Sequence, residues 1–123
     1  MVTKNEIKFI KSLSNKSIRN KFKLFIVEGK KSINEFLKSE HEPYKIFSIN
    51  PSVFKPSNEV IKISENQLSQ ISSLKSPNMH LAVFKQIEKS IEKKNVYFLL
   101  DSVNDPGNLG TIIRTLDWFG YNQ

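Results

Sequence analysis

One continuous apolar run near the carboxyl end constrains the fold of this chain more than any other feature. Residues 96–100 are all apolar and are followed by Asp101, which is the pattern of a parallel strand buried on both faces. After a polar turn, apolar residues recur with the helical spacing i, i+3, i+4 and i+7 at Leu109, Ile112, Ile113 and Leu116. One strand and one helix cannot form a buried parallel sheet, because such a sheet needs neighbouring strands. We therefore expect residues 95–123 to be the truncated start of a domain.

The first 85 residues contain shorter patterns that alternate between helix and strand. Amphipathic periodicity predicts helices over residues 4–14 and 30–39, and the capping box that starts at Ser64 predicts a third helix. Apolar runs of strand length cover residues 22–27, 44–50, 60–63 and 80–84. The first of these strands is apolar on both faces, which requires a covering layer on each side. The fold class is therefore α/β, with a small α/β/α domain over residues 1–85.

Two polar segments lie between these elements. Residues 15–21 are polar and cationic with a single apolar side chain, so we expect an exposed loop there. Residues 86–94 are rich in lysine and glutamate, and we expect them to form a linker between the two domains.

The positive charge of the chain is concentrated in its first third. The formal net charge is +7, and residues 1–38 hold ten basic side chains against three acidic ones, so the rest of the chain is neutral in sum. Such an asymmetry is typical of a surface that faces a polyanion. A lysine-rich face that only keeps the protein soluble is the alternative interpretation, and charge alone does not decide between the two.

Composition argues against several classes of protein. The chain has no cysteine, and its two histidines, His41 and His80, lie far apart in the sequence. We therefore expect no disulfide and no metal site. No run of 18 apolar residues is present, and the amino-terminal residues lack the apolar stretch of a secretory signal. These features disfavour a membrane protein and an exported one, and indicate a cytoplasmic protein.

The turn at residues 105–108 lies between the expected strand and the expected helix. Open α/β sheets bind ligands at this place, where free backbone N–H groups attract anions. Arg114 falls on a face of the helix away from the apolar stripe, together with Trp118. Asn108 is six residues before Arg114, so the two converge only if Asn108 lies before the regular helical turns. An ordinary turn and an exposed arginine are the alternative interpretation.

At this point the residues resemble a known family. Asp105-Pro106-Gly107-Asn108-Leu109-Gly110-Thr111-Ile112-Ile113-Arg114-Thr115 is similar to the first motif of the SpoU (TrmH-type) RNA 2′-O-ribose methyltransferases of the SPOUT superfamily. Members of that family often begin with a small α/β module that resembles the kink-turn-binding ribosomal proteins. Residues 25–29 with the helix after them, and residues 76–84, resemble that module.

The resemblance implies methyl transfer from S-adenosylmethionine to a ribose 2′-hydroxyl of ribosomal or transfer RNA. It assigns catalytic roles to Arg114, which would activate the hydroxyl, and to Asn108, which would position substrate and arginine. A guanidinium has a pKa above ~12, so electrostatic stabilisation of the developing alkoxide describes Arg114 as well as a base does. The resemblance also implies a knotted α/β methyltransferase domain that forms a homodimer.

The motifs that build the cofactor site in that family lie downstream of the first one and are absent here. We therefore assign no cofactor-binding residue in this chain, and expect the 123 residues alone to be inactive. RNA is expected to contact the basic residues of the first third, namely Lys16, Arg19, Lys21, Lys23, Lys30 and Lys31. Two other functions remain open, a free-standing RNA-binding module without catalysis and a generic anion-binding α/β fragment.

Overall fold

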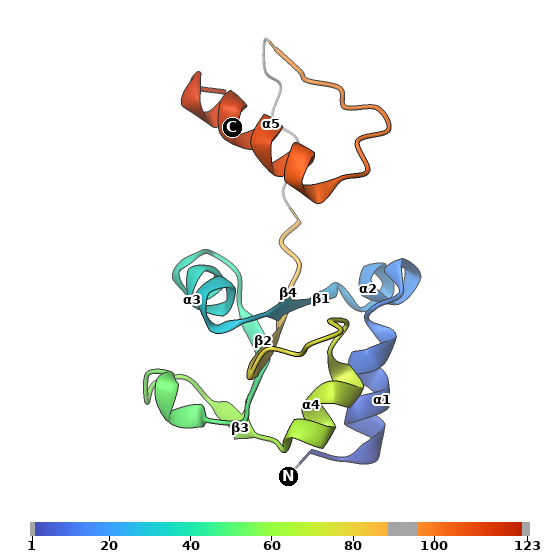
Figure 1. Cartoon of the computed structure of the whole chain (residues 1–123), viewed down its shortest axis with the longest axis vertical. Helices are drawn as coiled ribbons and strands as arrows, with labels where there is room; N and C mark the ends of the chain where they lie inside the picture. Colours follow the sequence, from blue (N-terminus) through green and yellow to red (C-terminus); the bar gives the residue numbers. More distant parts are fainter. Residues whose placement is uncertain (1, 89–95, 122–123) are drawn as a thin grey trace. The chain divides into compact units, whose positions relative to one another are not determined.

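The computed structural model describes residues 2–88 and 96–121 (Figure 1). The chain divides into two compact units, Met1–Lys89 and Ser90–Gln123.

A mixed four-stranded sheet forms the centre of the first unit. Its strands are β1 (Leu24–Glu28), β2 (Pro43–Ser48), β3 (Val60–Lys62) and β4 (His80–Lys85), in the spatial order β1-β4-β2-β3. β4 pairs antiparallel with β1 and with β2, whereas β2 and β3 are parallel. All four strands expected in this region are present, so the α/β fold class is confirmed.

The two faces of the sheet carry separate hydrophobic cores, because successive side chains of a strand point to opposite faces. Leu81 and Val83 of β4 belong to one core, with side chains from α1 (Lys4–Ser12) and α4 (Glu65–Ile71). Ala82 and Phe84 belong to the other core, with side chains from α3 (Lys30–Lys38) and the segment after the short helix η1 (Pro51–Val53). The sheet is therefore covered on both sides, as the apolar pattern of β1 requires.

Two capping boxes fix the starts of helices in the layer that holds α1 and α4. At α4 the Ser64 hydroxyl accepts from the backbone of Gln67, whose side chain accepts from the backbone of Ser64. Thr3 and Glu6 make the same exchange at α1. The expected helix after Ser64 is confirmed, and it buries Leu68 and Ile71 as the spacing predicts.

The loop expected over residues 15–21 is wrong, because the helix α2 (Lys16–Phe22) occupies that stretch. The Asn15 side chain accepts from the backbone N–H of Ser17 at 2.8 Å, which caps the helix. Ile18 packs against the core, and the Phe22 ring meets Phe9 edge-on with centroids 5.0 Å apart. The two apolar residues Ile18 and Phe22 are therefore enough to hold a helix here. Because Phe22 belongs to that helix, β1 begins at Leu24 and not at Phe22.

The second unit contains α5 (Pro106–Trp118), which the apolar stripe predicts. Asp105 caps it by accepting from the backbone N–H of Asn108 at 2.7 Å, and Pro106 stands at its first position. No residue of α5 is buried, and Trp118 is 87% exposed. Of the apolar stripe, Leu109 and Ile113 are exposed, whereas Ile112 and Leu116 are half-buried.

The strand expected over residues 96–100 does not form. These residues have no regular secondary structure, and their side chains are exposed, with Leu99 at 94%. A strand exists only through hydrogen bonds to a neighbouring strand. The described residues of this unit form no β-strand to which 96–100 could add, so the sheet that the apolar pattern predicts is absent from them.

A buried histidine makes the stability of the first unit depend on pH. His80 Nδ1 lies 2.8 Å from the hydroxyl of Ser48, and the Phe54 ring meets the imidazole edge-on. Burial lowers the pKa of His80 below its usual value, and the nearby Lys30 ammonium adds to the effect. The unfolded chain therefore binds a proton at a higher pH than the folded chain does.

We predict that the free energy of unfolding is at its full value above about pH 6.5 and decreases as the pH falls towards the lower pKa of folded His80. Urea denaturation between pH 7.5 and pH 5 measures this decrease. His80→Gln should flatten the part of the stability curve that begins near pH 6.5. Equal curves for His80→Gln and the unmodified chain would contradict the prediction.

Candidate nucleic-acid interface

The six basic residues expected to bind RNA do not form one surface. Lys16, Arg19 and Lys21 lie on α2, and Lys23 ends that helix. Lys30 and Lys31 lie at the start of α3. Ile18 of α2 packs against the core on one face of the sheet, whereas Ile33 of α3 belongs to the core on the other face (Figure 1). The sheet therefore divides the set into an α2 group and an α3 group.

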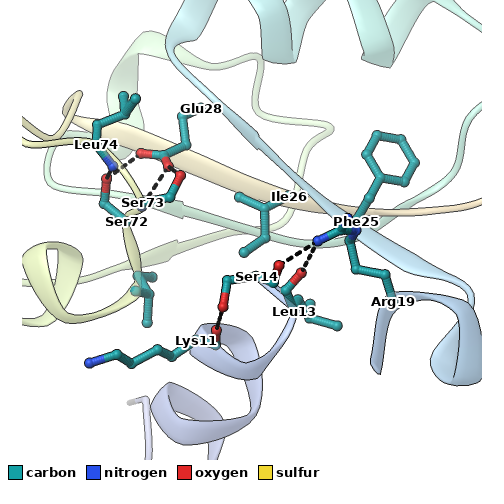
Figure 2. A pocket seen from close by; sticks show the side chains of 11 residues that line it. Lys11, Leu13, Ser14, Arg19, Phe25, Ile26, Glu28, Ser72, Ser73 and Leu74 are labelled. Atoms are coloured by element: carbon teal, nitrogen blue, oxygen red, sulfur yellow. Dashed lines mark hydrogen bonds between the residues drawn. The ribbon is translucent and has the colours of Figure 1, made fainter. Parts of the chain in front are cut away.

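Arg19 is engaged within the protein. Its Nη1 donates to the carbonyl oxygen of Leu13 at 3.0 Å and to that of Ser14 at 2.6 Å (Figure 2). These carbonyls lie just beyond the carboxyl end of α1, where backbone oxygens lack helical partners. A cation at a helix carboxyl end also interacts favourably with the helix dipole. Arg19 therefore joins α1 to α2, which is a structural role that the sequence pattern did not reveal.

The other members of the α2 group differ in how free their charges are. Lys23 adopts a left-handed conformation, with φ of 54°, and its Nζ bonds the Glu88 carboxylate at 2.8 Å. This ammonium lowers the pKa of Glu88. Lys21 lies over the ring of Phe22, 5.5 Å from its centroid. Lys16 and Lys21 are exposed and form no ion pair with any described residue, so they are the free cations of α2.

A hollow of about 620 Å³ lies beside Arg19, between the α1–α2 junction, β1 and the residues after α4 (Figure 2). On its opposite side the Glu28 carboxylate accepts from the Ser72 hydroxyl and, at 3.0 Å each, from the backbone N–H and the hydroxyl of Ser73. These bonds attach the segment after α4 to β1. The polar groups that Figure 2 shows around the hollow are thus largely bonded to one another, which indicates a structural junction rather than a ligand site.

The α3 group lines a groove. Two further lysines, which the sequence patterns did not single out, line the same groove. Lys30 and Lys31 share this groove, of about 590 Å³, with Lys38 and with Lys55 from the segment after η1. Lys38 falls seven residues after Lys31 and thus within about 20° of it around the helix, a signal that the sequence did contain. Lys55 comes from a different element, so only the fold shows that it belongs with α3.

Asn108 and Arg114 are not brought together. Asn108 is the third residue of α5, after the Asp105 cap, so both residues lie within one continuous helix. Six residues at about 100° each separate them by about 120° around the axis. Asn108 lines a hollow with residues 102–105, Thr111 and Ile112, whereas Arg114 is exposed and does not line it. Asn108 and Arg114 were expected to converge only if Asn108 lay before the regular helical turns. Because Asn108 lies within α5, the two side chains do not converge within this helix alone.

Two further observations concern the ranges 2–88 and 96–121. No three side chains of histidine, cysteine, aspartate or glutamate gather there in a way that would hold a metal ion. None of the helices in these ranges combines the length and the apolarity that a membrane span requires.

Comparison with known proteins identifies the family. Residues 4–82, which lie in the first unit, match the MRM3-like substrate binding domain. This chain belongs to the TrmH/SpoU family of RNA 2′-O-methyltransferases. It is 33% identical over 119 residues to the 23S rRNA (guanosine(2553)-2′-O)-methyltransferase RlmP of Bacillus subtilis, and the match covers 94% of this chain and 48% of that protein. The resemblance stated from the first motif is thereby confirmed.

Solved structures agree with this assignment. A putative RNA methyltransferase of the TrmH family from Porphyromonas gingivalis has a TM-score of 0.74 and 34% identity, over 98% of this chain and 50% of that one. An AdoMet-bound rRNA methyltransferase from Sinorhizobium meliloti has a TM-score of 0.69 and 25% identity, over 96% and 49%. The chain thus spans about half the length of the relatives it matches, and it corresponds to their amino-terminal half.

The position of Arg19 predicts a loss of stability on its substitution. Arg19→Gln removes two charge-assisted hydrogen bonds from a partly exposed site, so we expect a loss of about 1 kcal/mol in the free energy of unfolding. Lys21→Gln, the control on the same helix, should change it by less than about 0.5 kcal/mol. Urea denaturation of the two variants measures the difference. Equal stabilities would show that the bonds to Leu13 and Ser14 contribute nothing.

Proposed function

We propose that this chain is the RNA-recognition part of an S-adenosylmethionine-dependent methyltransferase that modifies a ribose 2′-hydroxyl. In this proposal residues 1–85 bind the RNA, residues 86–94 connect the domains and residues 95–123 begin the knotted methyltransferase domain. The observation that carries it is the match of residues 4–82 to a substrate-binding domain, in the part of the chain that holds the excess positive charge.

Ribosomal RNA is the substrate that the relatives favour. The Bacillus subtilis RlmP is named for guanosine 2553 of 23S rRNA. A second relative, 30% identical over 115 residues, is named as a putative TrmH family tRNA/rRNA methyltransferase. We therefore propose ribosomal RNA first and transfer RNA second. A mixed sheet with helices on both faces supports the further proposal that the first unit folds like the kink-turn-binding ribosomal proteins.

The proposed catalytic residues of this chain are Arg114 and Asn108. Both are exposed at the surface of α5, where a substrate can approach them. In this proposal Arg114 donates to the ribose oxygen as negative charge develops on it, and Asn108 positions the RNA. S-adenosylmethionine supplies the methyl group when bound. We propose that the residues that bind S-adenosylmethionine lie in the half of the relatives that this chain does not span, since a matched relative is AdoMet-bound.

The uncovered surface of α5 supports the proposed homodimer through the catalytic domain. Trp118 and Phe119 are exposed to 87% and 72%, and Ile113 of the apolar stripe to 54%. Apolar surface of this kind on a folded protein is usually covered by another domain or subunit.

We predict that the 123-residue chain binds a 23S rRNA fragment spanning guanosine 2553, with an affinity that falls steeply as salt increases. The quadruple variant Lys16→Gln, Arg19→Gln, Lys21→Gln, Lys23→Gln should bind more weakly and with a smaller salt dependence. Because Arg19 and Lys23 are bonded within the protein, Lys16→Gln with Lys21→Gln should account for most of the effect. Lys4→Gln with Lys8→Gln on α1 is the charge-matched control. An unchanged affinity and salt slope in the quadruple variant would refute the role of α2.

For Arg114 we predict a loss in the chemical step. In the methyltransferase with its catalytic half present, Arg114→Ala should lower the single-turnover rate by about 10² to 10³, with RNA affinity nearly unchanged. Arg114→Lys should restore little, because an ammonium does not reproduce the planar fork of the guanidinium. Methyl incorporation and RNA binding are measured separately. A rate within about threefold of the unmodified enzyme, roughly 0.65 kcal/mol in barrier height, would exclude a catalytic role.

A further inference from the structure

The groove between α3 and residues 53–58 brings basic side chains of two segments of the first unit together. It is about 590 Å³ in volume, and four of its lining residues are lysines, against the single acid Glu35. Glu35 accepts from Lys38 at 3.0 Å, so this pair is neutral. Lys30, Lys31 and Lys55 form no ion pair with any described residue. The groove therefore has three uncompensated positive charges along its walls.

Both walls of the groove are held in place by the core. On one side Ile33 of α3 is fully buried. On the other side Phe54 is buried and meets the His80 ring edge-on, with centroids 5.3 Å apart. Lys55 follows Phe54 directly. The lysines on the two walls are therefore presented from fixed backbone, and less entropy is lost when a ligand binds between them.

A tight turn adds to this preorganisation. The backbone N–H of Asn58 donates to the carbonyl of Lys55 at 2.9 Å, and Pro56 lies inside the turn. Proline presets the backbone angle that such a turn requires. The turn thus fixes where Lys55 and Asn58 enter the groove.

The other lining residues indicate what part of a ligand the groove contacts. Polar side chains come from Asn34, Ser57 and Asn58, and the apolar ones, Leu37 and Val53, are aliphatic. The lining contains no aromatic ring on which a base could stack, and stacking on such rings is how proteins usually hold unpaired bases. Lysines with amides and hydroxyls are instead typical of contacts to phosphate and sugar.

The positive charge of Lys30 also acts on a buried group of the protein. The Lys30 ammonium is close enough to contribute to the lowered pKa of the buried His80. A positive potential that acts on a buried ring also acts on an anion in the groove, where Lys31 and Lys55 add to it.

We propose that this groove binds the phosphodiester backbone of the substrate RNA, with Lys31 and Lys55 on opposite walls as the main contacts. The inference rests on the proposed function of the first unit as an RNA-binding domain. It adds a second RNA-contact region, which includes Lys55 and lies on the face of the sheet opposite α2. This region would recognise the RNA backbone and not the base sequence. RNA bound at both regions spans the two layers of the domain.

The test compares three lysine-to-glutamine double variants of the full 123-residue chain, and a fourth double variant that keeps the charge. Lys31→Gln with Lys55→Gln removes charge from the groove, Lys16→Gln with Lys21→Gln removes it from α2, and Lys4→Gln with Lys8→Gln on α1 is the matched control. Affinity is measured from 50 to 300 mM KCl for a 23S rRNA fragment spanning guanosine 2553 and for an RNA of equal length with scrambled sequence.

The groove variant should bind both RNAs about tenfold more weakly at low salt, with the salt slope reduced by about one to two. Lys31→Arg with Lys55→Arg keeps the charge and should restore affinity and slope. Circular dichroism verifies that each variant is folded. Lys31 and Lys55 are exposed and form no ion pair with any residue that the structure describes, so their substitution breaks none.

Two negative results have different meanings. If the unmodified chain binds neither RNA at 50 mM KCl, the proposed RNA-binding function fails, and the inference fails with it. If the unmodified chain binds and the groove variant equals the α1 control, the inference is overturned while the proposed function stands. A loss confined to the 23S fragment, with the scrambled RNA unaffected, would also overturn it, because backbone contacts do not depend on sequence.

Discussion

The pairing of β4 with both β1 and β2 is the interaction on which the rest of the first unit depends. β4 is the last of the four strands of this sheet in chain order but lies inside the sheet, and its residues 80–84 are all buried. Alternate side chains of this one strand complete the two cores, Leu81 and Val83 on one face, Ala82 and Phe84 on the other. Neither layer of helices is fully packed until residues far apart in sequence have met. Such a topology has many non-local contacts, which slow folding.

The same sheet determines how the positive charge is presented. The excess charge lies within 38 consecutive residues. Within that stretch, between Lys23 and Lys30, the chain forms β1, a strand of the sheet. Charges that are neighbours in sequence are thereby distributed to opposite layers. Part of the charge also serves the fold itself, since Arg19 bonds the end of α1 and Lys23 pairs with Glu88. The number of basic side chains in a segment is therefore an upper limit on the number that are free to bind a ligand.

How much could be predicted from the sequence depended on how local the cause was. The capping box at Ser64 and the strands of the first unit follow from patterns of a few residues, and they are present. α2 was missed because its apolar content is small and its cap, Asn15, lies in a stretch that reads as polar loop. The strand expected over 96–100 failed because pairing is not local. Lys55 joins α3 only through the position of η1 and Phe54, which no spacing in the sequence encodes.

The regular geometry of a helix constrains how the first motif can act in the proposed reaction. Asp105 and Pro106 fix the start of α5 by local bonds alone, so the helix needs no tertiary contact to begin at that place. Asn108 and Arg114 are then about 120° apart around one rigid axis. A single small group cannot contact both side chains from one side of α5. If both residues serve the reaction, the RNA must extend around the amino-terminal turns of the helix, with the reacting ribose near Arg114 and a neighbouring part of the RNA near Asn108.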